Sequence, residues 1–294
     1  MYGLAELRQV LDNPHLALRE VNRAYHRRLY QRPYNTNGID IFEEDWDNLV
    51  ILDACRYDTF AAETDFEGIE TRTSRGAATP EFVRGNFTGV AHHDVVYVAA
   101  NTWYFDLREE IDAEVHAAFY VDDRDPAVMT EQALELAAEY PDKRLLVHYI
   151  PPHHPFKGST AERALPPYEE QSNALFERIQ RGEIEIDDAT LRQIYRENLH
   201  RVLPDVDTLL SELGGKTVVT ADHGELLGDR TSPVPVPDYG HHTGLYVDEL
   251  VEVPWYESIN GERKEIVAEP PDGRGDSPTQ DVVDQRLEDL GYKV

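Results

Sequence analysis

The sequence predicts an α/β fold, a three-layer sandwich with a largely parallel central sheet. Four short runs are rich in β-branched residues and almost wholly apolar, as strands buried on both faces of a parallel sheet are. These runs are residues 48–54, 95–101, 144–150 and 216–222. Helical spacing of apolar residues occupies 127–139 and 187–213 between the runs, and this alternation of strand and helix is typical of the fold class.

The N-terminal segment is expected to be one helix. Residues 3–31 carry apolar side chains at helical spacing, and Asn35 to Gly38 then interrupt the pattern. The apolar positions are Leu4, Leu7, Val10, Leu11, Leu16, Leu18 and Val21. We therefore expect an N-terminal helical extension over residues 1–40 and a main domain over residues 41–294.

The chain turns polar beyond Pro254. Residues 260–278 are polar and rich in Pro and Gly, which indicates an exposed loop. Ser277 and Pro278 then supply the N-cap and first-turn signals for a last helix over residues 281–291.

The chain is strongly acidic. Lys and Arg total 28 and Asp and Glu total 57, which gives a formal net charge of −29. Self-repulsion of this size destabilises a compact state, but salt screens it within about 3 Å at 1 M. Acidity with scarce Lys is typical of a halophilic cytoplasm, and an acidic mesophilic protein is the alternative. In either case the field repels phosphate backbones, so no nucleic-acid partner is expected.

The single cysteine and the short apolar runs exclude several other classes of protein. Cys55 is the one cysteine, which excludes an intramolecular disulfide framework and a Cys-rich zinc module. No apolar run approaches the roughly 18 residues of a transmembrane span, and no secretory signal is recognisable, so a cytoplasmic location is expected. The basic stretch 19–32 is expected to be a solvated helix packed on the domain, with peripheral contact to a membrane or polyanion as the alternative.

Candidate ligands stand where the predicted strands end. Asp53 ends the first strand and Asp222-His223-Gly224 ends the fourth, while the third contains His148 and runs into residues 151–155. Ligands of open α/β sheets bind beyond the carboxyl ends of the strands. Two carboxylates and an imidazole suit Mn²⁺ or Zn²⁺ rather than Ca²⁺. For Asp53 the alternative is a cap on a helix that starts near Tyr57.

A nucleophile is expected at Thr79. Thr79-Pro80-Glu81 is a strong helix start, with Thr at the N-cap and Pro at the first helical position. The alternative is that Thr79 only caps the helix, but a capping residue can also act as a nucleophile. A helix N-terminus favours a bound phosphate or sulfate, and metal coordination would lower the pKa of the hydroxyl. Ser74 is the rival nucleophile.

Four segments in order resemble the sulfatase-like branch of the alkaline phosphatase superfamily, over roughly residues 45–258. NLVILDACRYDTF resembles the opening strand with its metal-ligand Asp, and ATPEFVRGNFTG resembles the nucleophile helix. HYIPPHHPF is similar to the segment whose His, here His153, meets the substrate anion. TADHGELLGD and YGHHTGLYVDELVEVPW resemble the second metal segment and the closing His, here His241. The resemblance makes residues 41–294 a catalytic domain, and LEDLGY resembles the tail of many such chains.

Departures from the family pattern narrow the implied activity. Formylglycine sulfatases carry Cys-x-Pro-Ser-Arg where this chain has Thr-Pro-Glu-Phe, so that chemistry is not expected. Their Asp-Asp pair is Asp53-Ala54 here and their late Asn is His223, which again favours Mn²⁺ or Zn²⁺ over Ca²⁺. The pattern resembles the phosphoglycerol and phosphoethanolamine transferase relatives, which use a Thr nucleophile. Pro152 stands where a two-metal member would carry an acid, so one tightly held ion is expected.

The resemblance implies a metal-dependent phosphoester hydrolase or phosphotransferase with a phospho-threonine intermediate. Asp53, Thr79, Asp222 and His223 would hold the metal, and Arg56, His153 and His241 would contact the anion. An ordinary salt bridge with Asp58 or another neighbouring acid is the alternative for Arg56. The expected partner is a small-molecule or a glycan- or lipid-linked phosphate or sulfate ester. The alternatives are sulfate-ester hydrolysis at the same site and a catalytically silent metal-binding interaction module.

Overall fold

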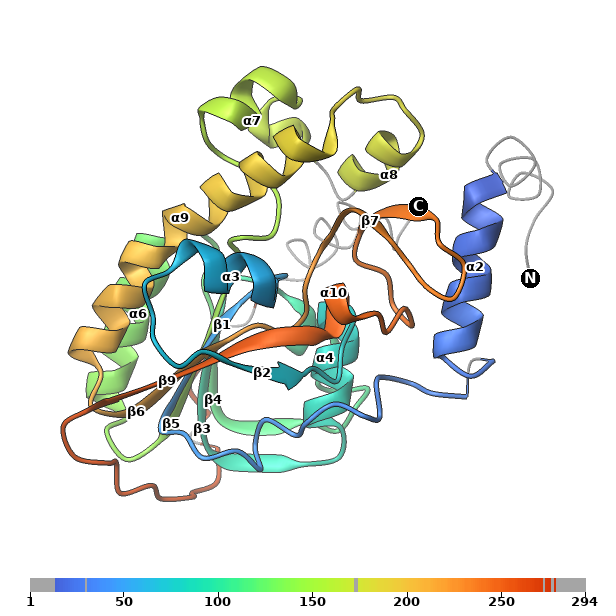
Figure 1. Ribbon diagram of the computed structural model, residues 1–294. Helices are drawn as coiled ribbons and strands as arrows, with labels where there is room; N and C mark the ends of the chain where they lie inside the picture. The colour runs from blue at the N-terminus through green and yellow to red at the C-terminus, as the bar shows by residue number, and fades with distance from the viewer. Residues whose placement is uncertain (1–13, 30, 172–173, 272, 276–277, 279–294) are drawn as a thin grey trace.

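A seven-stranded sheet forms the centre of the molecule (Figure 1). The computed structural model describes residues 14–29, 31–171, 174–271, 273–275 and 278. The strands of this sheet are β1 (Asn48–Leu52), β2 (Glu70–Thr73), β3 (Ala91–Ala99), β4 (Glu114–Tyr120), β5 (Arg144–Tyr149), β6 (Gly215–Thr220) and β9 (Glu252–Asn260). Their order across the sheet is β2-β9-β6-β1-β5-β3-β4.

The sheet is largely parallel, as predicted. Strand β1 pairs in parallel with β5 and β6, and β3 pairs in parallel with β4 and β5. Strand β9 runs antiparallel to both β6 and β2. The four predicted strands are present as β1, β3, β5 and β6, within a few residues at their ends. Strands β2, β4 and β9 were not predicted, and β2 is a polar edge strand with no apolar pattern to detect.

Helices cover both faces of the sheet, which confirms the three-layer sandwich (Figure 1). Alternate residues of β1 divide between the two cores, as the twofold repeat of a strand requires. Val50 and Leu52 join the core beneath α3 (Tyr57–Glu63), α6 (Pro126–Glu139) and α9 (Asp188–Glu212). Leu49 and Ile51 join the opposite core beneath α4 (Thr79–Phe87) and α5 (Trp103–Leu107).

The two predicted helices are confirmed as α6 and α9. Asp125 caps α6 by accepting from the backbone N–H of Ala127, and Asp187 caps α9 by accepting from that of Thr190. Each cap satisfies a backbone donor that the first helical turn leaves free. The helices therefore begin where short polar side chains precede the apolar pattern.

Smaller elements follow β5 and β6 at the carboxyl edge of the sheet. They are α7 (Ser159–Ala164), η1 (Tyr168–Glu170), α8 (Leu175–Gln180), α10 (Asp248–Val251) and the hairpin of β7 (Leu226–Arg230) with β8 (Pro237–Gly240). Phe156, Phe176, Tyr195 and Leu227 give this region its own apolar core. These elements build the walls around the strand ends.

The N-terminal helix is shorter than predicted. In the described part it is α2 (Pro14–His26), so the prediction of one helix up to residue 31 is wrong at its C-terminal end. The chain leaves the helix because Arg28 and Leu29 take left-handed backbone angles, with φ of 46° and 57°. The division at residues 40 and 41 stays a prediction.

The remaining predictions concern the C-terminus and membrane spans. Residues 261–271 contain no regular structure, which confirms the loop over that stretch. The predicted helix over 281–291, like residues 3–13, lies outside the described residues. Among the helices described, none has the length and apolar character needed to cross a bilayer.

Candidate metal centre

Asp53 is the first residue beyond β1 and is almost fully buried. Its backbone N–H donates to the carbonyl of Tyr149 on β5 at 3.2 Å. The chain then turns sharply at Ala54, whose φ is 60°. The carboxylate therefore faces the carboxyl edge of the sheet, and its Oδ1 has no hydrogen-bond partner.

Asp222 and His223 occupy the neighbouring position, just beyond β6. Oδ1 of Asp222 accepts two backbone N–H groups, from His223 at 2.9 Å and from Ala54 at 3.1 Å. Its Oδ2 is buried without a hydrogen-bond partner. Nδ1 of His223 donates to the carbonyl of Gly224 at 2.8 Å, so the lone pair on Nε2 faces the two carboxylates. Gly224 permits this turn, because a Cβ there would lie 2.1 Å from the carbonyl oxygen of Glu249.

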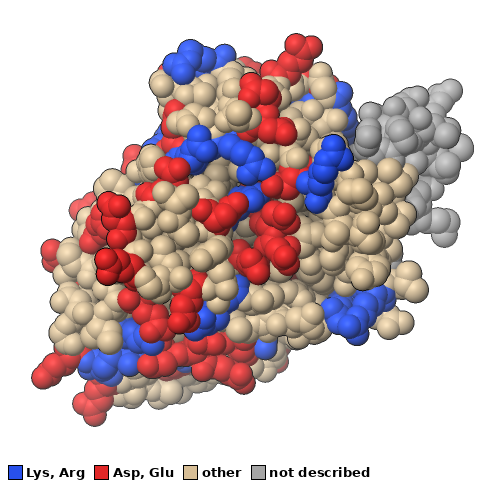
Figure 2. Space-filling model, in the orientation of Figure 1, with Lys and Arg blue, Asp and Glu red and all other residues tan. Residues whose placement is uncertain are grey.

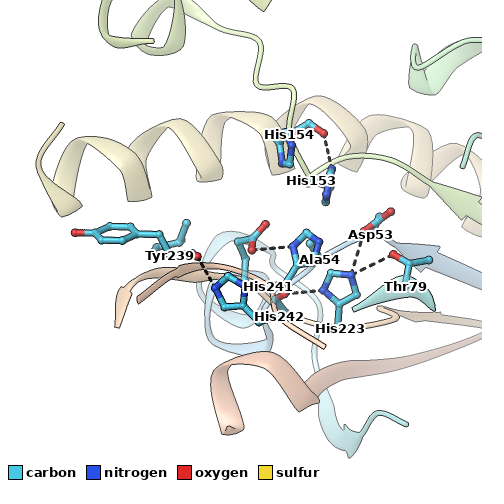
Figure 3. A network of polar contacts seen from close by, with 12 residues as sticks. Asp53, Ala54, Thr79, His153, His154, His223, Tyr239, His241 and His242 are labelled. Atoms are coloured by element: carbon cyan, nitrogen blue, oxygen red, sulfur yellow. Dashed lines mark hydrogen bonds and ion pairs between the residues drawn. The ribbon is translucent and has the colours of Figure 1, made fainter. Parts of the chain in front are cut away.

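Thr79 completes the group from the first turn of α4. Its Oγ1 lies 3.2 Å from Nε2 of His223 (Figure 3). The predicted N-cap role is wrong: α4 begins at Thr79 itself, the cap position is Ala78, and no side chain caps the helix. The hydroxyl is therefore directed at the imidazole rather than at the backbone of its own helix.

These side chains fit a divalent metal ion. Asp53, Asp222 and His223 each offer one ligand atom within 4.8 Å of the others, and all three are buried. Nε2 of His223 lies 3.4 Å from Oδ2 of Asp222 and 3.5 Å from Oδ1 of Asp53. Tetrahedral bonds near 2.0–2.2 Å separate neighbouring ligand atoms by about 3.4 Å. Two buried carboxylate oxygens without hydrogen bonds are costly to desolvate, so this centre could hold a metal that supplies their missing partner.

Burial and mutual repulsion set the charges of the group. Burial, followed by the charge of Asp222, raises the pKa of Asp53 well above its usual range. Burial also opposes ionisation of Asp222, but the imidazoles of His223 and His148 keep its pKa below the usual value. Burial lowers the pKa of His223 to about 4, which keeps that imidazole neutral. A neutral imidazole beside a carboxylate is the protonation state that metal binding requires.

His148 and Tyr97 support Asp222 from the adjacent strands β5 and β3. The hydroxyl of Tyr97 and Nδ1 of His148 are 3.0 Å apart, and both residues are buried. Nε2 of His148, which has no hydrogen bond, lies 3.6 Å from Oδ2 of Asp222. Residues beyond the ligands commonly fix a ligating carboxylate in this way. The pair extends the centre across four neighbouring strands, β6, β1, β5 and β3.

His153 and His241 lie over the centre from the loops (Figure 3). The His241 ring is 4.4 Å from the ring of His223 and 5.1 Å from that of His153, centroid to centroid. Nδ1 of His241 pairs with the buried Glu225 carboxylate at 3.0 Å. Burial opposes a charge on His241, but Glu225 outweighs it and raises the His241 pKa. Burial and the neighbouring imidazoles lower the pKa of His153 well below its usual value.

Arg56 makes the ion pairs that the alternative interpretation anticipated. Its guanidinium contacts Asp58 at 2.6 Å and Asp229 at 2.7 Å, and it also donates to the carbonyl of Glu225 at 2.9 Å. These partners hold the hairpin β7–β8 against the start of α3. The guanidinium is buried, so its charge is used inside the protein.

Ser74 forms hydrogen bonds with backbone groups near the centre. Its hydroxyl donates to the carbonyl oxygen of Asp222 and accepts the N–H of Gly76 at 3.0 Å. Of the two nucleophile candidates, only Thr79 directs its hydroxyl at the His223 imidazole.

Tyr97 and Glu225 were not found by the sequence analysis. Tyr97 carries a hydroxyl within the buried stretch 95–99 of β3, and Glu225 is an acid three positions beyond Asp222. Both carried a signal, since a polar group in a buried run needs a partner. The identity of that partner depends on which strands pair, and local sequence patterns do not predict the pairing.

Comparisons with known proteins find distant likeness in structure alone. No protein-family model and no curated protein matches the chain. The soluble domain of lipooligosaccharide phosphoethanolamine transferase A from Neisseria meningitidis is 14% identical, with 72% of this chain and 75% of that chain covered and a TM-score of 0.44.

Two further solved structures are similar at the same level. The periplasmic domain of phosphoethanolamine transferase EptC from Campylobacter jejuni is 13% identical, with 71% and 78% of the two chains covered and a TM-score of 0.46. A protein named as a sulfatase from Bacteroides thetaiotaomicron is 13% identical, with 84% and 71% covered and a TM-score of 0.43. Likeness this distant does not bear on activity.

Proposed function

We propose that this chain is a metal-dependent phosphoester hydrolase or phosphotransferase of the sulfatase-like branch of the alkaline phosphatase superfamily. The observation that carries the proposal is the convergence of four side chains on one buried point. Asp53, Asp222 and His223 offer ligand atoms there, and the Thr79 hydroxyl lies beside them. An activated hydroxyl next to a cluster of metal ligands is the arrangement required for covalent phosphoryl transfer.

Thr79 is the nucleophile in this proposal. Its Oγ1 forms a bond to phosphorus as the bond from phosphorus to the leaving oxygen breaks, and the hydroxyl proton is balanced by the proton that the leaving alcohol takes up. Water, or an acceptor alcohol, then attacks the phospho-threonine and restores Thr79. A bound divalent cation supplies positive charge that lowers the pKa of the hydroxyl and offsets the charge of the phosphoryl oxygens.

The surrounding residues bind and orient the anion. The N-terminus of α4, where Thr79 stands, presents the positive end of the helix dipole to the reacting phosphoryl group. His153 and His241 face the centre from the loops. Glu225 raises the pKa of His241, so Nε2 of that imidazolium can donate a hydrogen bond to a phosphoryl oxygen. Asp53, Asp222 and His223 would hold one Mn²⁺ or Zn²⁺ in preference to Ca²⁺, since one of these three side chains is an imidazole. The substrate class is a small-molecule or a glycan- or lipid-linked phosphate ester.

A substrate panel tests the proposal. The full chain, stripped with a chelator, is assayed on p-nitrophenyl phosphate, bis-p-nitrophenyl phosphate and p-nitrophenyl sulfate, with Mn²⁺ or Zn²⁺ added back. We expect release of nitrophenolate from a phosphate substrate only when metal is present. An acceptor alcohol that increases the rate identifies a transferase.

Each other outcome selects an alternative. Hydrolysis of the sulfate alone identifies a sulfate-ester hydrolase at the same site. Metal binding with no turnover on any of the three substrates, in low or molar KCl, identifies a silent metal-binding module and overturns the proposal.

A further inference from the structure

Helix α2 turns its polar side toward the domain. The Asn22 amide is buried between the helix and the hairpin β7–β8, where it donates to Oγ1 of Thr231 at 3.0 Å and to the carbonyl of Val234 at 2.9 Å. Its Oδ1 accepts the N–H of Val234 at 2.9 Å. Arg19 pairs with Asp238 at 3.5 Å on the same side. A surface helix ordinarily buries its apolar face, so this orientation is inverted.

The apolar side of α2 consequently faces outward. The exposed fractions are 37% for Leu18, 52% for Val21, 63% for Tyr25 and 76% for Leu29. We call these four residues the α2 stripe. Spacings of three and four residues place Leu18, Val21 and Tyr25 on one arc of the helix, and Leu29 follows just beyond its end. Among the described residues these are four of the eight exposed large hydrophobics, and the other four are scattered over separate segments.

The segment that carries the stripe is basic, although the chain as a whole is acidic. Residues 14–32 contain Arg19, Arg23, Arg27, Arg28 and Arg32 but a single acid, Glu20, in a chain of net charge −29. In Figure 2 the surface on the right, over α2, is mostly tan with a blue patch at its lower edge, while red patches gather elsewhere on the face. Arg19 and Arg23 are paired with Asp238 and Glu20, whereas Arg28 is exposed beside Leu29. At physiological salt charges act over about 8 Å, so Arg28 acts directly on what approaches the stripe.

We propose that the α2 stripe is a docking surface for an anionic lipid bilayer. Leu18, Val21 and Leu29 would enter the boundary between headgroups and acyl chains, with Tyr25 at the polar level and Arg28 beside the lipid phosphates. Charge complementarity favours this occupant. A second copy of the chain would bring arginines against arginines, whereas lipid phosphates neutralise them.

The docked helix would also bring the candidate centre close to the lipid surface. Arg19 contacts His242 at 3.3 Å and Arg23 donates to the carbonyl of Thr243 at 2.9 Å. The loop that carries His241 is therefore separated from the stripe by about one helix diameter, 10–12 Å. This step rests on the proposed function, and it indicates a lipid-headgroup phosphate ester as the substrate.

Vesicle sedimentation tests the docking surface. The full chain is mixed with vesicles of phosphatidylcholine, or of equal parts phosphatidylcholine and phosphatidylglycerol, in the lowest KCl concentration at which thermal melting shows it folded. We expect binding to the anionic vesicles, weakened about tenfold in the double variant Val21→Ser/Leu29→Ser because two apolar anchors are lost. The matched control is Val128→Ser/Ile259→Ser, which changes two other exposed aliphatic residues, and it should bind as the parent does.

A second pair of variants tests the charge. Arg28→Gln should weaken binding to anionic vesicles only, whereas Arg181→Gln, a change at an exposed arginine at the C-terminal end of α8, should not. The proposal is overturned if the parent does not bind anionic vesicles, or if the stripe variant binds equally well. A concentration-dependent dimer that the stripe variant abolishes, without vesicle binding, identifies a self-association surface instead. Vesicle binding needs no turnover, so Thr79→Ala should bind as the parent does even if the proposed function fails.

Discussion

Oγ1 of Thr79 lies 3.2 Å from Nε2 of His223, although the two residues are 144 positions apart in the chain. The contact joins the first residue of α4 to the end of β6. Because no side chain caps α4, the threonine hydroxyl is available for the centre rather than occupied by its own helix.

Replacement of Thr79 separates chemistry from folding. Thr79→Ala should remain folded, with a loss in turnover of several orders of magnitude, as when a member of a catalytic unit is deleted. Thr79→Ser keeps a hydroxyl and should retain activity. Thr88→Ala, at the other end of α4, is the matched control and should leave turnover unchanged. Acid-quench mass spectrometry should find phosphate on Thr79, and label on Ser74 would contradict the assignment.

Asp222→Asn should abolish metal binding. The amide can still accept the N–H groups of Ala54 and His223 at Oδ1, so the turn is preserved. Its NH₂ replaces the ligand oxygen Oδ2 and cannot bind a cation. Isothermal titration with Mn²⁺ or Zn²⁺ measures the effect. Asp205→Asn, on α9, is the control and should titrate like the parent, so equal affinities in all three proteins would place the metal elsewhere.

Tyr97→Phe should weaken metal binding without removing a ligand. The change deletes the hydrogen bond to Nδ1 of His148 and so loosens the imidazole that stands 3.6 Å from Asp222. A loss of about tenfold in metal affinity is expected for a residue of this kind. Tyr104→Phe, a buried tyrosine whose ring lies 5.0 Å from that of Tyr97, controls for packing. Equal losses of metal affinity in both variants would show that Tyr97 acts only through packing.

Arg56→Met should destabilise the fold in a pH-dependent way. Burial opposes ionisation of Asp229, but Arg56 and Arg192 outweigh it, so the folded-state pKa of Asp229 lies below its ordinary value. A depressed carboxyl pKa stabilises the fold above the unfolded-state value of about 3.9, and this contribution is lost as pH falls through the folded-state value. The variant should therefore be less stable by about 3 kcal/mol near pH 7. The difference from the parent should shrink below about pH 4.

Denaturant unfolding across this pH range measures the effect of Arg56→Met. Arg84→Met, which breaks the exposed pair with Glu110, is the matched control and should change stability little. A difference for Arg56→Met that stays constant into acid would show that packing, not charge, is responsible.

Salt should raise the melting temperature. A net charge of −29 repels itself over about 10 Å at 0.1 M salt but over only about 3 Å at 1 M. Thermal melting in 0.1 M and in molar KCl compares the two conditions. Equal melting temperatures would remove the argument for a salt-adapted chain.

The sequence identified much of the fold and the three side chains that meet as candidate ligands. The four buried runs became β1, β3, β5 and β6, because continuous β-branched runs suit strands with both faces covered. Asp53, Asp222 and His223 converge as expected, since the carboxyl ends of parallel strands share one edge. Strands β2, β4 and β9 escaped prediction, and the cap expected at Thr79 falls on Ala78, because a boundary set by tertiary contacts overrides local preference.

The sequence by itself determined which chemical groups stand at the strand ends, because residue type and strand period are local properties. Tertiary structure decided how those groups are used, since that depends on contacts between distant parts of the chain. Pairing of β1 with β6 brings the Ala54 N–H to Oδ1 of Asp222 and leaves Oδ2 without a partner. The fold pairs Arg56 with Asp229, which lies 173 positions away. It also buries Asn22 against Thr231, so that the apolar side of α2 faces outward. No local pattern contains these relationships, because each is a contact between side chains that the sequence separates and the sheet brings together.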